Sequence, residues 1–568
     1  MNTLDKIKQN IADAINQALK KKDLVKAADL VYPPNSAFGD LSLPCFNLAK
    51  ALKKTAVETG EFLVGKIELN DTVVAAKATG PFLNFTFNKA KLAQGVIEEI
   101  AKLKNKYGLN DIGKKKKVMV EFSNANTHKE YHVGHLRNIT FGQAIANILN
   151  ANGYKAMPVS YINDFGIHAA KTLWAFNKFY KKEKLPANKG YFLGKVYVRA
   201  SKELENNEAA KMETGQIMKN IESRSGADYK LWQKTRKWSI DGFNKIYKEL
   251  DIKFEHIFYE SEVIEKGLAM VVKLYAKHFL IKSQDAVIAD LNKYDLGVLV
   301  VLRSDGTALY PVADLALAEE KFKKYKIDKS IYVVDVRQGL YFKQLFKVME
   351  LLGFKQEMRH LSYEFVKLLE GMMSSRTGNV ITYEDLRNQA FAKAFKETKK
   401  RHKKWNEKKI NQVVNKLVNG ALKFEMLKVG ADKVITFDID RALRFDGFTA
   451  AYLQYTAARI NSILRKTKIK SSGPIDFKNL AEPKEMELVN KLAKYPETVA
   501  IAAKNYNPAE IAKYLFELAQ ELNDYYHAVR ILKAKAEIKQ ARLALIIAVK
   551  QVLENGLGLL GIEIMEEM

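Results

Sequence analysis

Three of the nine histidines lie close together, and their spacing indicates phosphate chemistry. His128, His132 and His135 fall within eight residues, just before a segment with helical periodicity. The first N–H groups of a helix are unpaired and the helix dipole is positive there, so anions bind well at this end. Imidazoles nearby can donate further hydrogen bonds to phosphate oxygens, and Gly134 allows a flat base or a backbone to approach closely. The cluster therefore predicts a phosphate-binding site.

The residues alone leave structural interpretations open. His132 and His135 would serve equally well as capping or core histidines, or as a metal pair that lacks a third ligand. A pattern of the form HxGH is short enough to recur by chance, so the elements around it have to be considered.

Those elements form a strand, a helix and a second strand. Residues 118–122, VMVEF, predict a buried strand, and the apolar side chains of residues 136–148 fall on one helical face that ends at Gly153. A second strand is expected over residues 156–161. Such a βαβ unit implies a parallel sheet whose ligand crevice lies at the carboxyl ends of its strands. We expect the site directly after these two strands.

The rest of the chain divides into three parts. Residues 1–110 predict a small α+β domain, with strands at 73–77 and 82–87 around a Gly80-Pro81 turn. Residues 111–385 predict a Rossmann-like catalytic domain, interrupted by a lysine-rich helical insertion at about 171–294, after which strands return around Asp305-Gly306. Residues 386–568 predict an all-α domain, so the fold class is multidomain α/β. The lysine run 114–117 is equally compatible with a solvated linker.

The charge suggests a polyanionic partner. The 568 residues include 93 Lys and Arg against 65 Asp and Glu, a formal net charge of +28, and 47% of the residues are apolar. Because this composition is globular, the excess charge must lie on folded surfaces. Nucleic acid, an anionic membrane and simple solubility remain possible explanations. The basic stretch KETKKRHKKWNEKK is by itself more typical of a solvated helix face.

Cysteine and hydropathy indicate the compartment. Cys45 is the only cysteine, which excludes an intrachain disulfide and a thiolate zinc cluster and favours a reducing compartment, with the cytoplasm as the default. No run of about 18 apolar residues is present, and the N-terminal segment lacks the apolar centre of a signal peptide. Neither secretion nor membrane insertion is expected.

Longer motifs carry a family resemblance. VEFSNANTHKEYHVGHLRN, followed by YINDFG, resembles the class I aminoacyl-tRNA synthetases, and within them the arginyl-tRNA synthetases. Their first signature, HIGH, stands here as residues 132–135, and the agreement includes Glu121, Asn126 and the Leu136-Arg137 pair. It continues through LYPVADLA, IYVVDVRQ, GMMSSRTGN and AAYLQYTAARINSILRK to VLENGLGLLGIEIMEEM. The resemblance covers nearly the entire chain.

The second class signature, KMSKS, is altered. Met372-Met373-Ser374-Ser375-Arg376 lacks both lysines, and arginyl enzymes without the second lysine typically place one just upstream of HIGH, where this chain has Lys129. A cation beside the developing phosphate charge is what the chemistry needs. The resemblance implies an ATP site with His132, His135, Met373 and Ser374, and a catalytic set of Lys129, His132, Gly134, His135, Ser374, Ser375 and Arg376.

The resemblance also implies an arginine pocket. A guanidinium group presents five donors and requires carboxylates and hydroxyls around it. The matching positions are Glu121, Tyr310 and Asp314 for the guanidinium end and Asn126 and Gln338 for the α-amino and carboxylate end, with Asn124 also in the arginine-binding set. Tyr310 and Asp314 share one face if their segment is helical. Such a pocket should reject uncharged analogues without an editing domain.

Positions that match tRNA contacts lie at both ends of the chain. The first domain resembles the one that meets the tRNA elbow, which implies contacts from Phe82 and Asn84, although some relatives have the longer Gln at the latter position. Tyr452 and Tyr455 match aromatic positions near the anticodon, where unpaired bases stack on aromatic rings, but tyrosines three apart are also common core residues. Met568 ends where the family's C-terminus packs toward the anticodon.

The expected activity is that of a two-step arginine–tRNA ligase. Arginine reacts with ATP to give arginyl-adenylate and pyrophosphate, and the arginyl group then passes to the terminal adenosine of the tRNA. The expected partners are tRNA(Arg), L-arginine and ATP with Mg²⁺ as a substrate ion. We expect no tightly bound cofactor, no bound metal, no membrane contact, and a monomer. A catalytically silent RNA-binding paralogue and a nucleotidyltransferase for a smaller substrate are the alternatives.

Overall fold

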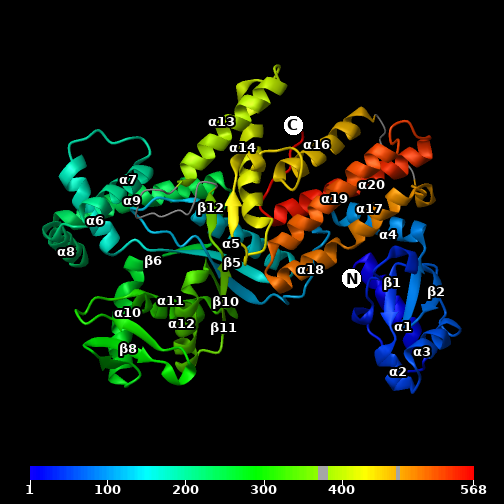
Figure 1. Cartoon of the computed structure of the whole chain (residues 1–568), viewed down its shortest axis with the longest axis horizontal. Coiled ribbons are helices and arrows are strands. Elements are labelled where there is room, and N and C mark those ends of the chain that lie inside the picture. Colours follow the sequence, from blue (N-terminus) through cyan, green and yellow to red (C-terminus); the bar gives the residue numbers. More distant parts are fainter. Residues whose placement is uncertain (369–380, 468–473) are drawn as a thin grey trace.

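The computed structural model describes residues 1–368, 381–467 and 474–568. A parallel sheet lies at the centre, the N-terminal domain and the helices α6–α9 lie at opposite ends, and the C-terminal helices lie between the sheet and the N-terminal domain (Figure 1). Of the described helices, none is both long enough and apolar enough to cross a membrane.

The central sheet has five parallel strands in the order β11-β10-β4-β5-β6. The strand β4 is buried on both faces, which explains its continuous run of apolar residues. It pairs with β5, as predicted from the βαβ pattern. The strands are β4 (Lys117–Glu121), β5 (Lys155–Ile162), β6 (His256–Tyr259), β10 (Lys329–Asp335) and β11 (Glu357–Tyr363).

The helix between β4 and β5 is α5 (Val133–Ala151), and it confirms the predicted helix. It starts at the N-cap residue His132, and the chain turns back at Gly153, whose φ of +77° is the left-handed conformation that glycine adopts easily. The helix lies very close to the residue that follows β4, because a Cβ added at Gly142 would lie 2.2 Å from Cγ of Phe122. The third turn of α5, which carries Gly142, thereby packs directly against the carboxyl end of β4.

The segment after β5 contains the insertion and a second, antiparallel sheet in the order β7-β8-β9. We predicted a helical insertion over residues 171–294, but β6 lies inside that range and joins the central sheet. Its four residues follow a lysine-rich stretch and give no long apolar run. The elements are α6 (Ile167–Ala175), α7 (Lys189–Glu203), α8 (Glu208–Glu222), α9 (Gly226–Glu249), α10 (Glu260–Ala276), β7 (Ile281–Ser283), β8 (Ala286–Asp290), β9 (Val298–Leu302), α11 (Tyr310–Tyr325) and α12 (Gly339–Leu351).

The N-terminal domain is an α+β unit built on the antiparallel sheet β1-β3-β2. The two predicted strands are present as β2 and β3, and they pair across the Gly80-Pro81 turn. The hydroxyl of Tyr107 donates to the carbonyl of Leu492 at 3.0 Å, which joins this part of the chain to the C-terminal helices. The elements are α1 (Thr3–Ala18), β1 (Leu41–Pro44), α2 (Phe46–Leu52), α3 (Ala56–Val64), β2 (Val73–Thr79), β3 (Phe82–Phe87) and α4 (Lys89–Leu103).

The C-terminal region is mainly helical, with one short strand, β13, paired to β12. The buried guanidinium of Arg137 on α5 binds this region to the sheet by donating to five carbonyls, among them Glu364 and Lys433. The elements are β12 (Val366–Leu368), α13 (Tyr383–Arg401), α14 (Glu407–Leu427), β13 (Ile435–Phe437), α15 (Ile439–Ala442), α16 (Ala450–Lys466), α17 (Pro483–Ala493), α18 (Tyr495–Asn505), α19 (Pro508–Ala528) and α20 (Ala536–Leu559).

Candidate active site

A cavity of about 720 Å³ lies at the carboxyl ends of β4, β5 and β10. Its position agrees with the crevice that the parallel topology predicts. Nine residues that the sequence singled out line it together: Glu121, Asn124, Asn126, His132, Gly134, His135, Tyr310, Asp314 and Gln338. They come from positions up to 217 residues apart (338 − 121), so only the fold brings them together.

The two histidines of the first signature form a reciprocal cap at the start of α5. Nδ1 of His132 accepts from the N–H of Gly134, and Nδ1 of His135 accepts from the N–H of His132, both at 3.1 Å. Each ring therefore carries its proton on Nε2, which remains available as a donor. A Cβ at Gly134 would lie 2.9 Å from the His132 ring, so glycine lets this ring fold over the helix end. Capping and ligand binding are thus compatible roles.

Both imidazoles are neutral at physiological pH. Burial, and then the charges of Lys129 and Arg337, lower the pKa of His132 to about 4. Burial, and then His132 and Lys129, hold the pKa of His135 well below its usual value. At pH 7 each ring therefore offers a single N–H donor without a positive charge. Lys129 does not line the cavity, but its positive charge contributes to the lowering of both pKa values.

Asp314 is a carboxyl group in the lining of the cavity. It lies one helical turn after Tyr310 on α11, as the spacing predicted, and the Tyr341 hydroxyl donates to it. Burial raises its pKa to about 7, against the opposing effect of the Tyr341 hydrogen bond. Ionisation of a buried carboxyl group is costly when the group has no charged partner, and it becomes favourable when a cation binds beside it. Tyr310 is 66% exposed and stands at the mouth of the cavity.

Glu121 already has a cationic partner. Its carboxylate pairs with Lys321 of α11, and both side chains are buried. Its other oxygen accepts from the side-chain amide of Asn124 at 3.2 Å. Although burial alone would lower the pKa of Lys321, the neighbouring charge of Glu121 raises it, so the pair is ionic. Its charge is therefore compensated before any substrate binds.

Three residues beside this cavity were missed by the sequence analysis. Lys321 lies seven residues after Asp314, the spacing of one helix face, but a lysine there did not stand out. Tyr341 lies three residues after Gln338. Glu260 accepts from the side chain of Asn163 at 3.2 Å, and burial raises its pKa to about 8. Its partner Asn163 lies 97 residues earlier in the chain, so no local pattern indicated it.

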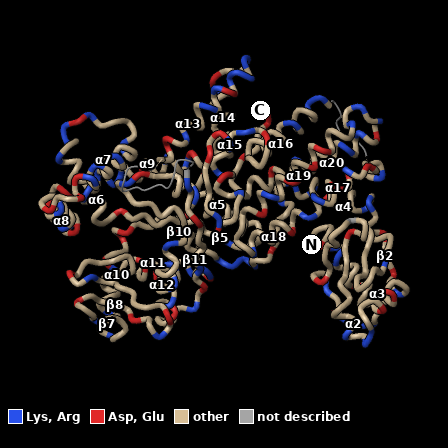
Figure 2. Tube along the Cα trace, in the orientation of Figure 1, with Lys and Arg blue, Asp and Glu red and all other residues tan. Residues whose placement is uncertain are grey.

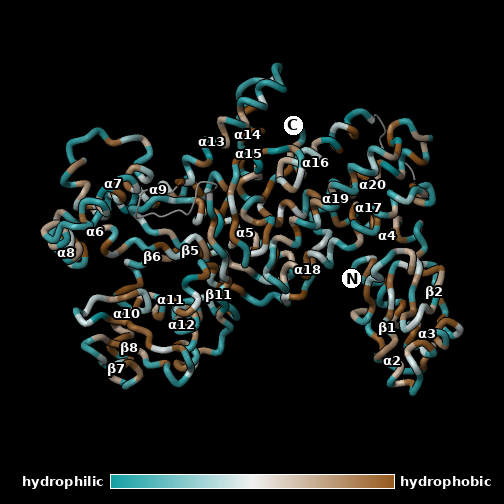
Figure 3. Tube along the Cα trace, viewed as in Figure 1, coloured by the Kyte–Doolittle hydropathy of each residue, from teal (hydrophilic) through white to brown (hydrophobic). Residues whose placement is uncertain are grey.

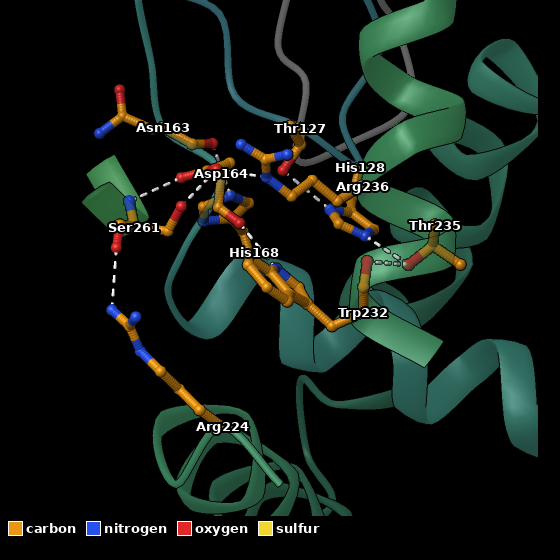
Figure 4. Close-up of polar contacts among 10 residues, drawn as sticks. All are labelled: Thr127, His128, Asn163, Asp164, His168, Arg224, Trp232, Thr235, Arg236 and Ser261. Atoms are coloured by element: carbon orange, nitrogen blue, oxygen red, sulfur yellow. Dashed lines mark hydrogen bonds and ion pairs between the residues drawn. The ribbon is translucent and has the colours of Figure 1, made fainter. Parts of the chain in front are cut away.

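Several predicted residues lie elsewhere. Met373, Ser374, Ser375 and Arg376, together with Met372, fall outside the described residues. His128, the third histidine of the cluster, does not reach the cavity, because it is fully buried between Thr127 and Thr235 (Figure 4). Among the described residues no group of three His, Cys, Asp or Glu is placed to hold a metal ion.

The predicted tRNA-binding residues differ in exposure. Phe82 is 37% exposed and packs against Phe46, whereas Asn84 is only 4% exposed within the middle strand of its sheet, which leaves little surface for a base. Tyr452 packs against α19, and its hydroxyl accepts from Asn523 at 2.6 Å. Tyr455 is 42% exposed and lines a second cavity, of about 410 Å³, together with Met568 and residues of α13.

Three family models match the chain. They are the class I tRNA synthetase (R) catalytic domain over residues 96–437, the arginyl tRNA synthetase N-terminal domain over residues 5–87, and the DALR anticodon-binding domain over residues 453–568. The chain is 37% identical over 575 residues to the arginine–tRNA ligase of Bdellovibrio bacteriovorus, covering 98% of each protein. It is 35% identical over 567 residues to that of Clostridioides difficile, covering 99% of this chain and 100% of the relative.

A solved structure has the same architecture. The arginyl-tRNA synthetase of Thermus thermophilus superposes with a TM-score of 0.81 at 26% identity, covering 98% of this chain and 99% of that one. The sequence relatives match at full length, and the catalytic model alone spans more than half of the chain. The chain therefore belongs to the arginyl-tRNA synthetase family, within the class I aminoacyl-tRNA synthetases.

Proposed function

We propose that this chain is an arginine–tRNA ligase that carries out both steps at the cavity beside α5. The carboxylate of arginine attacks the α-phosphate of ATP and releases pyrophosphate, and a hydroxyl of the terminal adenosine of tRNA(Arg) then takes the arginyl group. The observation that carries the proposal is one cavity that joins neutral imidazole donors at a helix N-terminus to the buried carboxyl of Asp314. The two sequence relatives compared above are both named arginine–tRNA ligases, which favours an active enzyme over a catalytically silent paralogue.

The arginine end of the cavity recognises charge. In the proposal Asp314 and Tyr310 hold the guanidinium, and Glu121 completes this end through its pair with Lys321. Three further lining residues hold the α-amino and carboxylate groups: Asn124, Asn126 and Gln338. A neutral analogue would leave the carboxyl of Asp314 buried without a cation, which supports strong rejection without an editing site.

The ATP end of the cavity supplies donors and positive charge. His132 and His135 donate to phosphate oxygens, and the N-terminus of α5 adds its dipole. Lys129, with Ser374, Ser375 and Arg376 of the second signature and Met373 at the nucleotide, completes the proposed site. Mg²⁺ enters with ATP as a substrate ion. Because the reaction needs no covalent enzyme intermediate, positioning and electrostatic stabilisation supply the catalysis.

A direct assay tests this function. Arginine-dependent exchange between pyrophosphate and ATP is expected, measured with and without tRNA, together with transfer of labelled arginine to tRNA. Citrulline, in which an uncharged ureido group replaces the guanidinium, should support neither reaction. If an intact, folded preparation shows no exchange and no charging, the proposal is wrong and a silent RNA-binding protein remains.

The proposed path of the tRNA runs along the whole molecule. The elbow lies near Phe82 and Asn84, and the anticodon near Tyr452, Tyr455 and Met568, at the other side of the C-terminal helices. The single cysteine and the tRNA substrate support a cytoplasmic enzyme, and we expect it to act as a monomer.

The α13–α14 hairpin supports RNA binding beside the Tyr455 cavity. It projects from the body of the protein (Figure 1), blue positions mark its tip in Figure 2, and Figure 3 shows that this tip is hydrophilic. Residues 393–409 contain nine Lys or Arg and two Glu. Trp405 stacks on His402 at 3.8 Å between ring centroids, which adds an aromatic platform to the positive charge. Arg401 and His402 line the cavity that also contains Tyr455.

Neutralising the tip should weaken tRNA use selectively. Replacing the exposed lysines 399, 400, 403 and 404 by glutamine is expected to raise KM for tRNA by about tenfold or more and to reduce its salt dependence, because fewer counterions are released. Arginine-dependent exchange should be unchanged where it runs without tRNA. The matched control replaces four exposed lysines near the second sheet, at positions 273, 277, 282 and 293. If the two quadruple variants had equal effects, the loss of net charge alone would explain the result, and the hairpin would have no specific role in tRNA binding.

A further inference from the structure

The segment that carries Lys129 is enclosed by the helical insertion. Residues 127–130 connect the end of β4 to α5, and the ammonium group of Lys129 lies 5.1 Å from the ring centre of Tyr197 on α7. The backbone of α7 comes close at the next residue, since a Cβ at Gly194 would lie 3.1 Å from both N and Cα of Glu130. The position of Lys129 therefore depends on elements outside the nucleotide fold.

His128, the residue before Lys129, has an unusual backbone conformation. Its φ of +63° lies in the left-handed region, which is unfavourable for a residue with a Cβ. Its side chain is fully buried. A conformation of this kind persists only where the surrounding contacts hold it. The insertion helix α9 supplies those contacts.

All three nitrogens of His128 have partners, and Figure 4 shows those of the two ring nitrogens. Its backbone N–H donates to the hydroxyl of Ser239 on α9, and its ring nitrogens lie 2.9 Å from the hydroxyls of Thr127 and Thr235. The Thr235 hydroxyl donates its single proton to main-chain carbonyls of α9, so it accepts from Nε2–H of the ring. Burial, and then the charge of Arg236, lower the pKa of His128 to about 3, so the ring is neutral.

The same helix also holds the loop after β5. Arg236 forms a salt bridge of 2.5 Å with the fully buried Asp164, whose backbone carbonyl accepts from the indole of Trp232 at 2.8 Å (Figure 4). The carbonyl of Asn163 in turn accepts from the N–H of Thr127 at 3.0 Å. One face of α9 thus fixes the two loops that follow β4 and β5.

We propose that His128 is a positioning residue, locked onto α9 by Thr235 and Ser239, that aims Lys129 at the phosphates of ATP. The proposal rests on the proposed function, in which Lys129 supplies the cation that the second signature lacks. It assigns a catalytic purpose to the insertion: without the bonds to α9, the left-handed turn at His128 relaxes, and Lys129 no longer starts from the backbone position from which its side chain can reach the phosphates.

Two substitutions at one position separate the hydrogen bond from packing. Thr235→Val keeps the shape of the side chain but removes the hydroxyl, whereas Thr235→Ser keeps the hydroxyl and loses a methyl group. We expect Thr235→Val to lower kcat of pyrophosphate exchange by at least about tenfold, with KM for arginine within about threefold of wild type, since small displacements of a catalytic group are costly. Thr235→Ser should remain within about threefold in both constants. The reverse ranking would assign Thr235 to packing and overturn the proposal.

A double-mutant cycle tests the connection to Lys129. In a Lys129→Ala background, Thr235→Val should lower kcat by less than about threefold, because the group that it positions is already absent. If Thr235→Val causes the same factor in both backgrounds, the proposal is wrong. Ser239→Ala is the second variant, with the same expected pattern, and it applies if Thr235→Val does not fold.

The control and the reference reactions keep the two proposals distinct. The control is Gly215→Ala. Gly215 lies on α8 of the same insertion, and a Cβ added there would meet open space, so this variant should leave kcat unchanged. An inactive wild-type protein would refute the proposed function itself. An active wild type with an unaffected Lys129→Ala variant would refute the role of Lys129, and with it this inference.

Discussion

Replacing Asp314 by asparagine is expected to lower kcat/KM for arginine by about 10³-fold, with KM for ATP within about threefold of wild type. The loss follows from charge: the guanidinium would be buried beside a neutral amide, and an unpaired buried charge costs about 3–5 kcal/mol. The amide has nearly the shape of the carboxylate, and the Tyr341 hydroxyl can still donate to its oxygen. Arginine-dependent exchange at saturating ATP measures the effect.

A matched control lies on the same helix. Glu320 of α11 pairs with Lys266 at 2.9 Å on the outer side, so Glu320→Gln removes one negative charge without touching the cavity. It should change kcat/KM for arginine by less than about twofold, as exposed pairs contribute little. If Asp314→Asn raised KM for ATP as strongly as it weakened arginine use, the assignment of Asp314 to arginine would be wrong.

The pH profile gives an independent signature of the same carboxyl. Burial raises the pKa of Asp314 to about 7, so the group is increasingly protonated below that pH, and arginine has to displace the proton. Wild-type kcat/KM for arginine should therefore fall as the pH is lowered from about 8 to about 6, and this fall should be smaller in Asp314→Asn. The pKa of His132, about 4, excludes it from this range.

Glu260, with a pKa of about 8, titrates nearby, so Glu260→Gln should shift the upper part of the profile only.

The central unit of the fold could be predicted because its signals are local. The strand β4 reads as a buried strand, α5 has an apolar face and a glycine at its end, and together they define a parallel crossover. The site followed from that topology, since the carboxyl ends of parallel strands share one edge. The strand β6 could not be predicted in the same way, because a strand of four residues without a long apolar run depends on its neighbours in the sheet.

The residues of the cavity came from the family resemblance, and their interactions came from the structure. Nothing near Glu121 in the sequence indicates that a lysine 200 residues later neutralises it. His128 shows that closeness in sequence can also mislead. Its spacing grouped it with His132 and His135, although its side chain does not reach the cavity. A left-handed turn directs its ring into α9 instead. Local spacing reports which residues share a segment, whereas the direction of each side chain is set by backbone geometry and distant partners.

Lys321→Met is expected to produce the largest loss of stability. The substitution preserves most of the side-chain volume but leaves Glu121 buried without its cation, which should cost about 3–5 kcal/mol of unfolding free energy. The double variant Glu121→Gln/Lys321→Met removes both charges and should recover most of that loss. Thermal unfolding followed by circular dichroism, with Lys324→Met as the surface control on α11, measures both effects. A single variant as stable as wild type would contradict the buried pair.

The double variant also decides what Glu121 does in catalysis. Its two oxygens already bind Lys321 and Asn124, so among the described lining residues Asp314 is the carboxyl group without an ion pair before arginine binds. We therefore expect kcat/KM for arginine in the folded double variant to fall by less than about tenfold, far less than in Asp314→Asn. A loss as large as that of Asp314→Asn would instead show that Glu121 exchanges Lys321 for the guanidinium. In that case Lys321 would occupy the position of the substrate guanidinium until arginine binds.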